Sequence, residues 1–156
     1  MVDLRTIRTA GDADLPALLA LYQHLIPGDA QPSPKAAREI FARFLAFPGS
    51  AIFLAETAGH LVASCTLVVV PNLTRGGACY GLLENVVTHG GHRNQGHGKA
   101  LLAHATHAAW AAGCYKLMLL TGSSDPATHA FYRSAGFEPS KTGYQIRAIP
   151  ARGAPP

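Results

Sequence analysis

The residues that most clearly point to chemistry form one glycine-rich stretch in the middle of the chain, Arg93-Asn94-Gln95-Gly96-His97-Gly98-Lys99. A strand-like segment at 80–88 precedes it, and an alanine- and leucine-rich helical segment at 99–112 follows it. A glycine in a helix costs about 1 kcal/mol relative to alanine, so glycines at a helix start indicate a steric requirement. A helix N-terminus also offers unpaired N–H groups and the positive end of its dipole. We therefore expect a phosphate-bearing ligand to press against the backbone here.

Two common phosphate-binding motifs do not fit this stretch. A P-loop needs Gly-x4-Gly-Lys-Ser/Thr, but Gly98-Lys99 is followed by Ala100 and the first position is Arg93. A dinucleotide fingerprint needs a third small residue where Leu101 stands, and it belongs to an early strand–turn–helix unit. Neither a nucleotide-hydrolysing P-loop nor a dinucleotide fold is indicated.

Glu84 is the only carboxylate in the strand predicted at 79–88, where leucines and valines flank it. Apolar surroundings make a carboxylate a stronger base, so Glu84 is a candidate general base; a structural salt bridge is the alternative. Asn85 alternates to the opposite face of the strand and is predicted to be structural.

Eight histidines raise the question of a metal. His89 and His92 lie in the glycine-rich turn, and His104 and His107 lie at helical spacing, but no carboxylate or cysteine accompanies either pair closely. We expect no metal site.

The elements that must position these residues alternate along the chain. Strands are predicted at 4–9, 51–56, 61–70, 79–88, 115–121 and 144–149, and helices begin near Asp12 or Asp14, Ser33, Lys99 and Asp125. The first helix is expected to end near Pro27-Gly28. The strand–helix–strand unit over 79–121 predicts a right-handed crossover between parallel strands. The order favours an α+β fold in which helices flank a mixed sheet.

Length and composition fit one folded domain over 1–150, with 151–156 as a disordered tail. No apolar run approaches the roughly 20 residues of a membrane span, and no signal-peptide pattern occurs. Three cysteines, an odd number in apolar surroundings, predict free thiols and a cytoplasmic protein. The net charge is +4, but Lys and Arg are scattered, so we expect neither a nucleic acid nor a membrane as partner.

The pattern Arg93-x-x-Gly96-x-Gly98 resembles the acyl-CoA loop of the GNAT superfamily of N-acetyltransferases. The helical segment that begins at Asp125 and ends in Tyr132-x-x-x-Gly136-Phe137 resembles the second motif of that superfamily. The order of elements over residues 3–149 is also similar. The resemblance implies a central mixed, mostly antiparallel sheet flanked by helices, with a V-shaped split between the parallel strands at 80–88 and 115–121.

The resemblance further implies acetyl-CoA as co-substrate, with its pantetheine arm in the split and its pyrophosphate on the glycine-rich loop. The implied contacts involve Val86, Val87, Thr88, Arg93, Asn94, Gln95, Gly96, His97, Gly98, Lys99, Asp125, His129 and Tyr132. Arg93 and Lys99 either add charge or form a solvated surface pair. The family often has asparagine where Asp125 stands; an ionised aspartate only accepts, and helix capping is sufficient to explain it. His129 either contacts the cofactor or substrate or is a surface histidine.

By the same resemblance, Tyr132 is the expected proton donor to the departing thiolate, and a core aromatic beside Phe131 and Phe137 is the alternative. Glu84 serves as base or as amine-binding group. The expected activity is direct transfer of an acetyl group to a primary amine of a small molecule or peptide. A GNAT-like module that binds acyl-CoA without turnover is the competing interpretation.

The loops at 27–34 and 71–78 and the first two helices are expected to bind the acceptor. Asp29 and Glu39 are the only acids noted there. They do not indicate a strongly acidic pocket. The acceptor stays open at this point, and so does the choice between monomer and homodimer.

Overall fold

The computed structural model describes residues 5–151 of the chain. Five strands form one sheet: β1 (Thr6–Thr9), β2 (Ala51–Thr57), β3 (His60–Val70), β4 (Tyr80–Thr88) and β5 (Leu117–Leu119). They lie in sequence order, antiparallel except for the parallel pair β4–β5. Four α-helices accompany them: α1 (Leu15–Tyr22), α2 (Pro34–Leu45), α3 (His97–Ala111) and α4 (Pro126–Ser134). The predicted α+β fold is confirmed.

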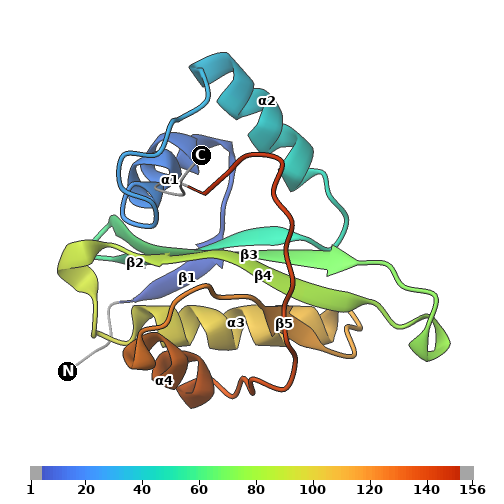
Figure 1. Ribbon diagram of the computed structural model, residues 1–156. Coiled ribbons are helices and arrows are strands. Elements are labelled where there is room, and N and C mark those ends of the chain that lie inside the picture. Colours follow the sequence, from blue (N-terminus) through green and yellow to red (C-terminus); the bar gives the residue numbers. More distant parts are fainter. Residues whose placement is uncertain (1–4, 152–156) are drawn as a thin grey trace.

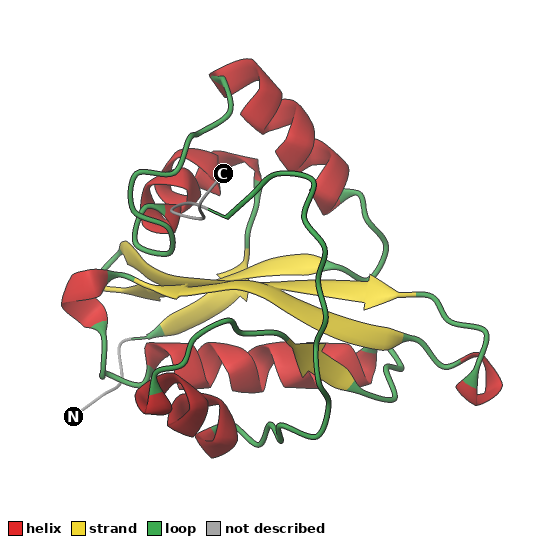
Figure 2. Cartoon of the chain, in the orientation of Figure 1, coloured by secondary structure: helices red, strands yellow, loops and turns green. Residues whose placement is uncertain are grey.

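The helices cover both faces of the sheet (Figures 1 and 2). Helices α1 and α2 lie on one face, and α3 and α4 lie on the other. Alternation along β2 serves both layers, because Leu54 packs with Leu18 and Phe41, whereas Phe53 packs with the α3 side chains. Strand β3 is buried on both faces and is accordingly apolar over most of its length, as its central position requires.

Strand β1 is fastened to the rest of the sheet by an ion-pair cluster. The Arg8 guanidinium bonds both carboxylate oxygens of Asp14, at 2.6 and 2.7 Å, and Glu56 on β2 at 2.5 Å. These hydrogen bonds lower the pKa of Asp14 to about 2. The cluster fixes β1 in the sheet, and Arg5, directly before β1, reaches the region where α3 begins.

Several elements differ from the prediction. Helix α1 ends at Tyr22 rather than near Pro27-Gly28, and β5 is confined to Leu117–Leu119. The strand predicted at 144–149 is wrong, because within the described chain these residues form neither strand nor helix and are exposed. They run past the β5 edge without a partner strand to pair with (Figure 1). Of the predicted tail, residues 152–156 lie outside the described residues.

The three cysteines are free, and Cys79 Sγ lies 3.6 Å from Cys114 Sγ. Between residues 5 and 151, none of the helices has the length and apolar character needed to cross a bilayer.

Candidate functional site

The predicted split is present where β4 and β5 stop pairing. β4 has nine residues, but β5 pairs only with Gly81, Leu82 and Leu83. At the paired end the strands are close, since a Cβ on Gly81 would lie 2.7 Å from Leu117 Cδ1. From residue 84 to residue 88, no described strand lies beside β4 on the β5 side. The backbone of this half-strand is therefore open to a ligand on one edge.

A β-bulge marks the point of divergence. Thr66 on β3 pairs with Glu84 and Ser64 pairs with Val87, so two residues of β4 stand opposite one of β3. Asn85 takes a left-handed conformation, with φ of 49°. The prediction that Asn85 alternates away from Glu84 is wrong, because the bulge interrupts the alternation and both side chains border the same hollow.

The hollow in the split, which we call the donor hollow, has a volume of about 260 Å³. Its lining comes from the end of α1, from β4, from β5 and from α4: Leu25, Ile26, Leu83, Glu84, Asn85, Val86, Leu119, Leu120, Thr121, Gly122 and Tyr132. The structure thus brings the two predicted catalytic residues, Glu84 and Tyr132, to one site.

These two side chains have different environments. Tyr132 is half-buried against Phe131 and Phe137, with ring centroids 5.0 and 6.4 Å away. Burial raises the pKa of Tyr132, so its hydroxyl stays protonated at neutral pH. Glu84 is exposed, and the apolar enclosure expected from its neighbours in sequence is not formed.

At the far end of the split, the glycine-rich loop leads into α3. The helix starts at His97, two residues earlier than expected, with Gly96 as a left-handed N-cap at φ of 80°. At Gly98 a Cβ would lie 3.0 Å from Phe131 Cζ and 3.5 Å from Thr88 Oγ1. Close packing against α4 therefore explains Gly98, and the cap conformation explains Gly96, without the pressing anion inferred from the sequence. The same packing sets the first turn of α3 beside the open end of β4.

Arg5 was not singled out from the sequence, yet it braces this loop. Its Nη1 donates to the carbonyl oxygen of Gly96 and its Nη2 to that of Gln95, both at 3.1 Å. Arg5 thus holds two carbonyl oxygens of the loop on its own side. With the carbonyls bound to a cation, the loop is arranged so that its N–H groups can face an anion. No motif spacing could have indicated Arg5, because it lies 91 residues from Gly96 in the chain.

The predicted loop residues have unequal access to a ligand. His97 is only 5% exposed, so its side chain is not available to a ligand. What His97 can offer is its backbone N–H, which belongs to the first turn of α3. Arg93 is exposed, and its Nη2 donates to the His24 carbonyl oxygen at 3.4 Å. His24 Nδ1 in turn accepts from the Gly90 N–H at 3.2 Å. Lys99 is exposed in the first turn of α3. The loop is thereby tied to the segment after α1.

Asp125 and His129 have structural roles in α4. Asp125 caps the helix by accepting from the Ala127 N–H at 2.9 Å. His129 Nε2 lies 2.8 Å from the Ser123 carbonyl oxygen. Neither side chain borders the donor hollow. Among the residues that the structure describes, no group of three or more His, Cys, Asp or Glu is arranged to hold a metal ion.

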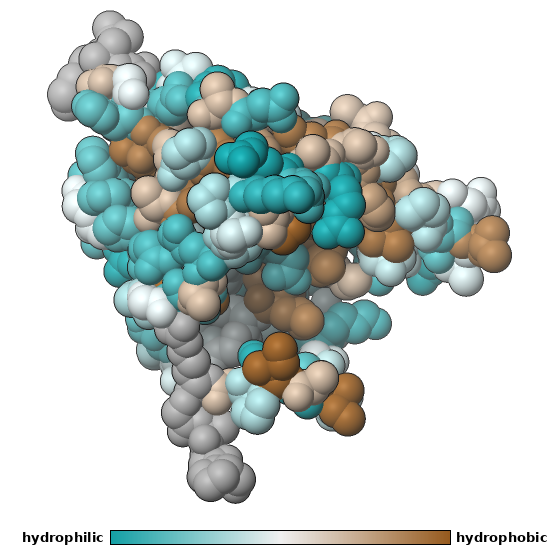
Figure 3. All heavy atoms as spheres, turned by 90° about the horizontal axis from the view of Figure 1, so that it is seen from above, coloured by the Kyte–Doolittle hydropathy of each residue, from teal (hydrophilic) through white to brown (hydrophobic). Residues whose placement is uncertain are grey.

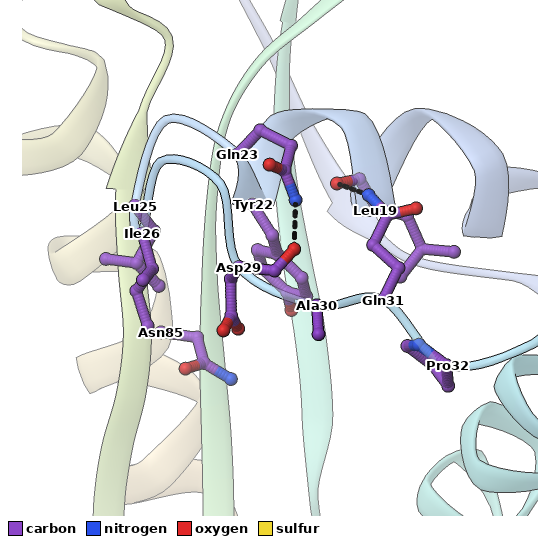
Figure 4. A pocket seen from close by; sticks show the side chains of 10 residues that line it. All are labelled: Leu19, Tyr22, Gln23, Leu25, Ile26, Asp29, Ala30, Gln31, Pro32 and Asn85. Carbon is purple, nitrogen blue, oxygen red and sulfur yellow. Dashed lines mark hydrogen bonds between the residues drawn. The ribbon is translucent and has the colours of Figure 1, made fainter. Parts of the chain in front are cut away.

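A second hollow of about 190 Å³, the acceptor hollow below, adjoins the first (Figure 4). Leu25, Ile26 and Asn85 border both hollows. The remaining lining residues come from α1 and the segment after it: Leu19, Tyr22, Gln23, Asp29, Ala30, Gln31 and Pro32. The loop predicted at 27–34 and the first helix therefore contribute to this hollow, as expected, whereas Asn85 was not foreseen in it.

The polar side chains of the acceptor hollow are partly held in place. Gln23 Nε2 donates to the Asp29 carbonyl oxygen at 3.3 Å, and Gln31 Nε2 donates to the Leu19 carbonyl oxygen at 3.2 Å. Figure 4 shows the Asn85 amide on the side of the hollow towards which the Asp29 side chain extends. Burial raises the pKa of Tyr22. The hollow thus offers amide, carboxylate and hydroxyl groups.

Comparisons with known proteins agree with this geometry. Residues 17–137 match the sequence profile of the acetyltransferase (GNAT) family. A glucosamine 6-phosphate N-acetyltransferase from Trypanosoma brucei brucei is 31% identical over 137 residues, covering 88% of this chain and 90% of that protein. The solved structure of a "Putative acetyltransferase from Agrobacterium tumefaciens str. C58" is 51% identical with a TM-score of 0.87, covering 91% of this chain and 99% of that one.

A third solved structure, AAC(6')-Iy in complex with the bisubstrate analog CoA-S-monomethyl-acetylneamine, is 19% identical. It shares the fold, with a TM-score of 0.78 and coverage of 93% of this chain and 98% of that one. Since the family profile spans most of the sequence, the chain belongs to the acetyltransferase (GNAT) family. Acetyl-CoA is the acetyl donor of this family.

The bracing of the loop leads to a binding prediction. Arg5→Ala removes two charge-assisted hydrogen bonds to the loop and one positive charge, and we expect the Kd for coenzyme A to rise about tenfold or more. Isothermal titration calorimetry measures it. Arg38→Ala, which removes an exposed arginine from α2, is the charge-matched control and should leave the Kd within about twofold. Equal Kd values for the two variants would contradict a role of Arg5 in holding the loop.

Proposed function

We propose that the protein transfers the acetyl group of acetyl-CoA to a primary amine by direct attack in a ternary complex. The observation that carries this proposal is the donor hollow, which places Tyr132 and Glu84 beside the open edge of β4. The name of the Trypanosoma relative, an N-acetyltransferase for an amino sugar phosphate, supports an amine as acceptor.

The open half of β4 and the start of α3 suit the two ends of the donor. Backbone groups of Val86, Val87 and Thr88 on the β5 side would pair with the amides of the pantetheine arm, as an added strand would. The N–H groups in the first turn of α3 would bind the pyrophosphate, since these groups have no helical partner. Arg5, Arg93 and Lys99 add positive charge around that end of the site.

The chemistry requires a neutral amine, because an ammonium has no lone pair with which to attack. At pH 7 an alkylammonium with a pKa of ~10.4 is almost entirely protonated, so a base is needed. Glu84, exposed in the hollow, accepts the amine proton directly or through water. The amine nitrogen then bonds to the thioester carbonyl carbon. A backbone N–H on the open edge of β4 stabilises the oxyanion.

Collapse of the tetrahedral species breaks the carbon–sulfur bond and forms the amide, and the excess proton on the nitrogen passes through water to restore the Tyr132 hydroxyl. The departing thiolate takes its proton from the Tyr132 hydroxyl, which burial keeps protonated. Asn85, on the shared wall of the two hollows, is suited to orient the amine between base and donor.

The acceptor hollow favours a hydroxylated amine without a phosphate. Gln23, Asp29, Gln31 and Asn85 supply hydrogen-bonding groups that match hydroxyl and amino groups, and none of the ten lining residues is Lys or Arg. A phosphate such as that in the substrate name of the Trypanosoma relative would find no cation among those ten residues. We therefore place the acceptor among amino sugars and related hydroxylated amines.

Release of free thiol from acetyl-CoA tests this proposal. The panel of acceptors should contain glucosamine, glucosamine 6-phosphate, an aminoglycoside, a polyamine and a peptide with a free amine. We expect release with a hydroxylated amine and a higher kcat/KM for glucosamine than for its phosphate. Acetyl-CoA binding without thiol release on any amine would contradict catalysis and favour a non-catalytic acyl-CoA-binding module.

Tyr132→Phe should separate chemistry from binding. Loss of the hydroxyl removes the acid, so kcat should fall about a hundredfold or more, while the Kd for coenzyme A stays within about twofold. Tyr115→Phe is the matched control and should keep wild-type kcat, because Tyr115 lies at the paired end of β4 and β5, where its N–H donates to the Cys79 carbonyl oxygen, and does not border the donor hollow. An unchanged kcat in Tyr132→Phe would remove the assignment of Tyr132 as the acid.

Asn85→Gly removes the amide and still allows the left-handed backbone of the bulge. We expect KM for the acceptor to rise about tenfold because an orienting hydrogen bond is lost, with an unchanged Kd for coenzyme A. Steady-state kinetics and calorimetry give the two values. A rise in the Kd for coenzyme A with unchanged acceptor KM would assign Asn85 to the donor side instead.

A further inference from the structure

Two of the three cysteines lie side by side where β4 and β5 begin. Cys79 directly precedes β4, and Cys114 lies in the segment between α3 and β5. Their Sγ atoms are 3.6 Å apart, although the two residues are 35 positions apart in the chain. The third thiol, Cys65, is fully buried on β3. The fold therefore brings together two thiols for which the proposed acetyl transfer has no use.

The backbone holds the two cysteines at a spacing that a disulfide can bridge. The N–H of Tyr115, the residue after Cys114, donates to the Cys79 carbonyl oxygen at 2.9 Å, so the two segments are spaced as neighbouring strands, about 4.8 Å apart. A disulfide joins Cα atoms that lie about 4.4–6.8 Å apart. The Cys114 N–H donates to the Ala109 carbonyl oxygen at 3.0 Å, and Cys79 Sγ donates to that of Ala112 at 3.3 Å. Bond formation then requires rotation of side chains and no change of fold.

The two thiols differ in their access to solvent. Cys79 is partly exposed at the root of the segment between β3 and β4, which projects on the right of Figures 1 and 3. Cys114 is buried, and this burial together with the neighbouring Cys79 raises the pKa of Cys114 to about 11, so it stays a thiol at neutral pH. The charges of Arg75 and Lys116 lie 5.7 and 5.5 Å from the centre of the Tyr115 ring. Partly exposed, positively charged surroundings of this kind are typical of reactive cysteines.

We propose that Cys79 and Cys114 are a redox-active pair, which a peroxide converts into an intramolecular disulfide that fastens the paired end of the split. The Cys79 thiolate attacks one oxygen of hydrogen peroxide and the O–O bond breaks. A sulfenic acid remains on Cys79, and the second oxygen leaves as water with the proton that the thiol lost. Cys114 then attacks the Cys79 sulfur and gives up its proton, so that the S–S bond forms and the sulfenic oxygen leaves as a second water. Two thiols are oxidised and one peroxide is reduced, and two molecules of a small thiol restore the pair by exchange.

The bond joins the residue before β4 to the segment that leads into β5. Neither cysteine borders the donor hollow, so the oxidation depends on none of the residues assigned to acetyl transfer. The loop that the disulfide closes contains the whole of β4 and α3. Closing this loop restricts the unfolded chain and thereby stabilises the oxidised protein.

Counting thiols tests the proposal independently of any activity. The full chain is treated with an equimolar amount of hydrogen peroxide, denatured and alkylated. Untreated protein should carry three alkyl groups, one for each cysteine, and treated protein should carry one, on Cys65. Dithiothreitol should restore all three. Mass spectrometry of an unreduced digest should find one peptide pair, linked through Cys79 and Cys114.

Two variants and a melting temperature complete the test. Cys79→Ser should keep both of its remaining thiols after peroxide treatment, whereas Cys65→Ala, the matched control, should lose both of its own. Oxidation should raise the Tm of the wild type by about 5 °C or more and leave that of Cys79→Ser unchanged. Three alkyl groups after treatment, a sulfinic acid on Cys79, a disulfide between two copies, or a linked pair without a rise in Tm would each overturn the proposal.

Discussion

The whole site depends on one constraint, the early end of pairing between two parallel strands. β4 needs hydrogen-bond partners along both edges, yet β5 pairs only with Gly81, Leu82 and Leu83. Backbone N–H and C=O groups left unpaired away from water are costly, so the other half of β4 favours a partner that is not part of the sheet. The pantetheine arm that we propose to bind here is extended and bears amides, so it would meet that need. The β-bulge at Asn85 is the local device that turns β4 away from β5 and gathers Glu84 and Asn85 on one side.

The glycine-rich loop extends the same site beyond the sheet. Arg5 holds its carbonyls from the side of β1, and His24 holds it from the end of α1. The contact of Gly98 with Phe131 brings α4, and with it Tyr132, next to the first turn of α3. The proposed pyrophosphate site and the proposed acid are therefore positioned by one packing contact. A loop held by such contacts would present its N–H groups at a lower entropy cost of ordering them on binding.

The local signals in the sequence were enough to predict the fold and the family. Strand and helix periodicity predicted the order of elements, and the pattern Arg93-x-x-Gly96-x-Gly98 with the Tyr132 motif predicted the family. Long-range features were beyond such signals. Arg5 contacts a loop 91 residues away, and the bulge at Asn85 follows from the register with β3. The segment at 144–149 has the pattern of a strand, but a strand also needs an edge to pair with, which local sequence does not specify.

The site outlined by the split and the loop is tested most directly by titrating ¹⁵N-labelled protein with coenzyme A and following backbone amide resonances. The largest changes should occur at two places far apart in the chain: the open half of β4 at Val86–Thr88 and the loop and first turn of α3 at 94–99. Tyr132 and its neighbours on α4 should respond as well, because Phe131 packs against Gly98. Changes confined to other surfaces, with the amides of Val86–Thr88 and of residues 94–99 unaffected at saturation, would contradict the account.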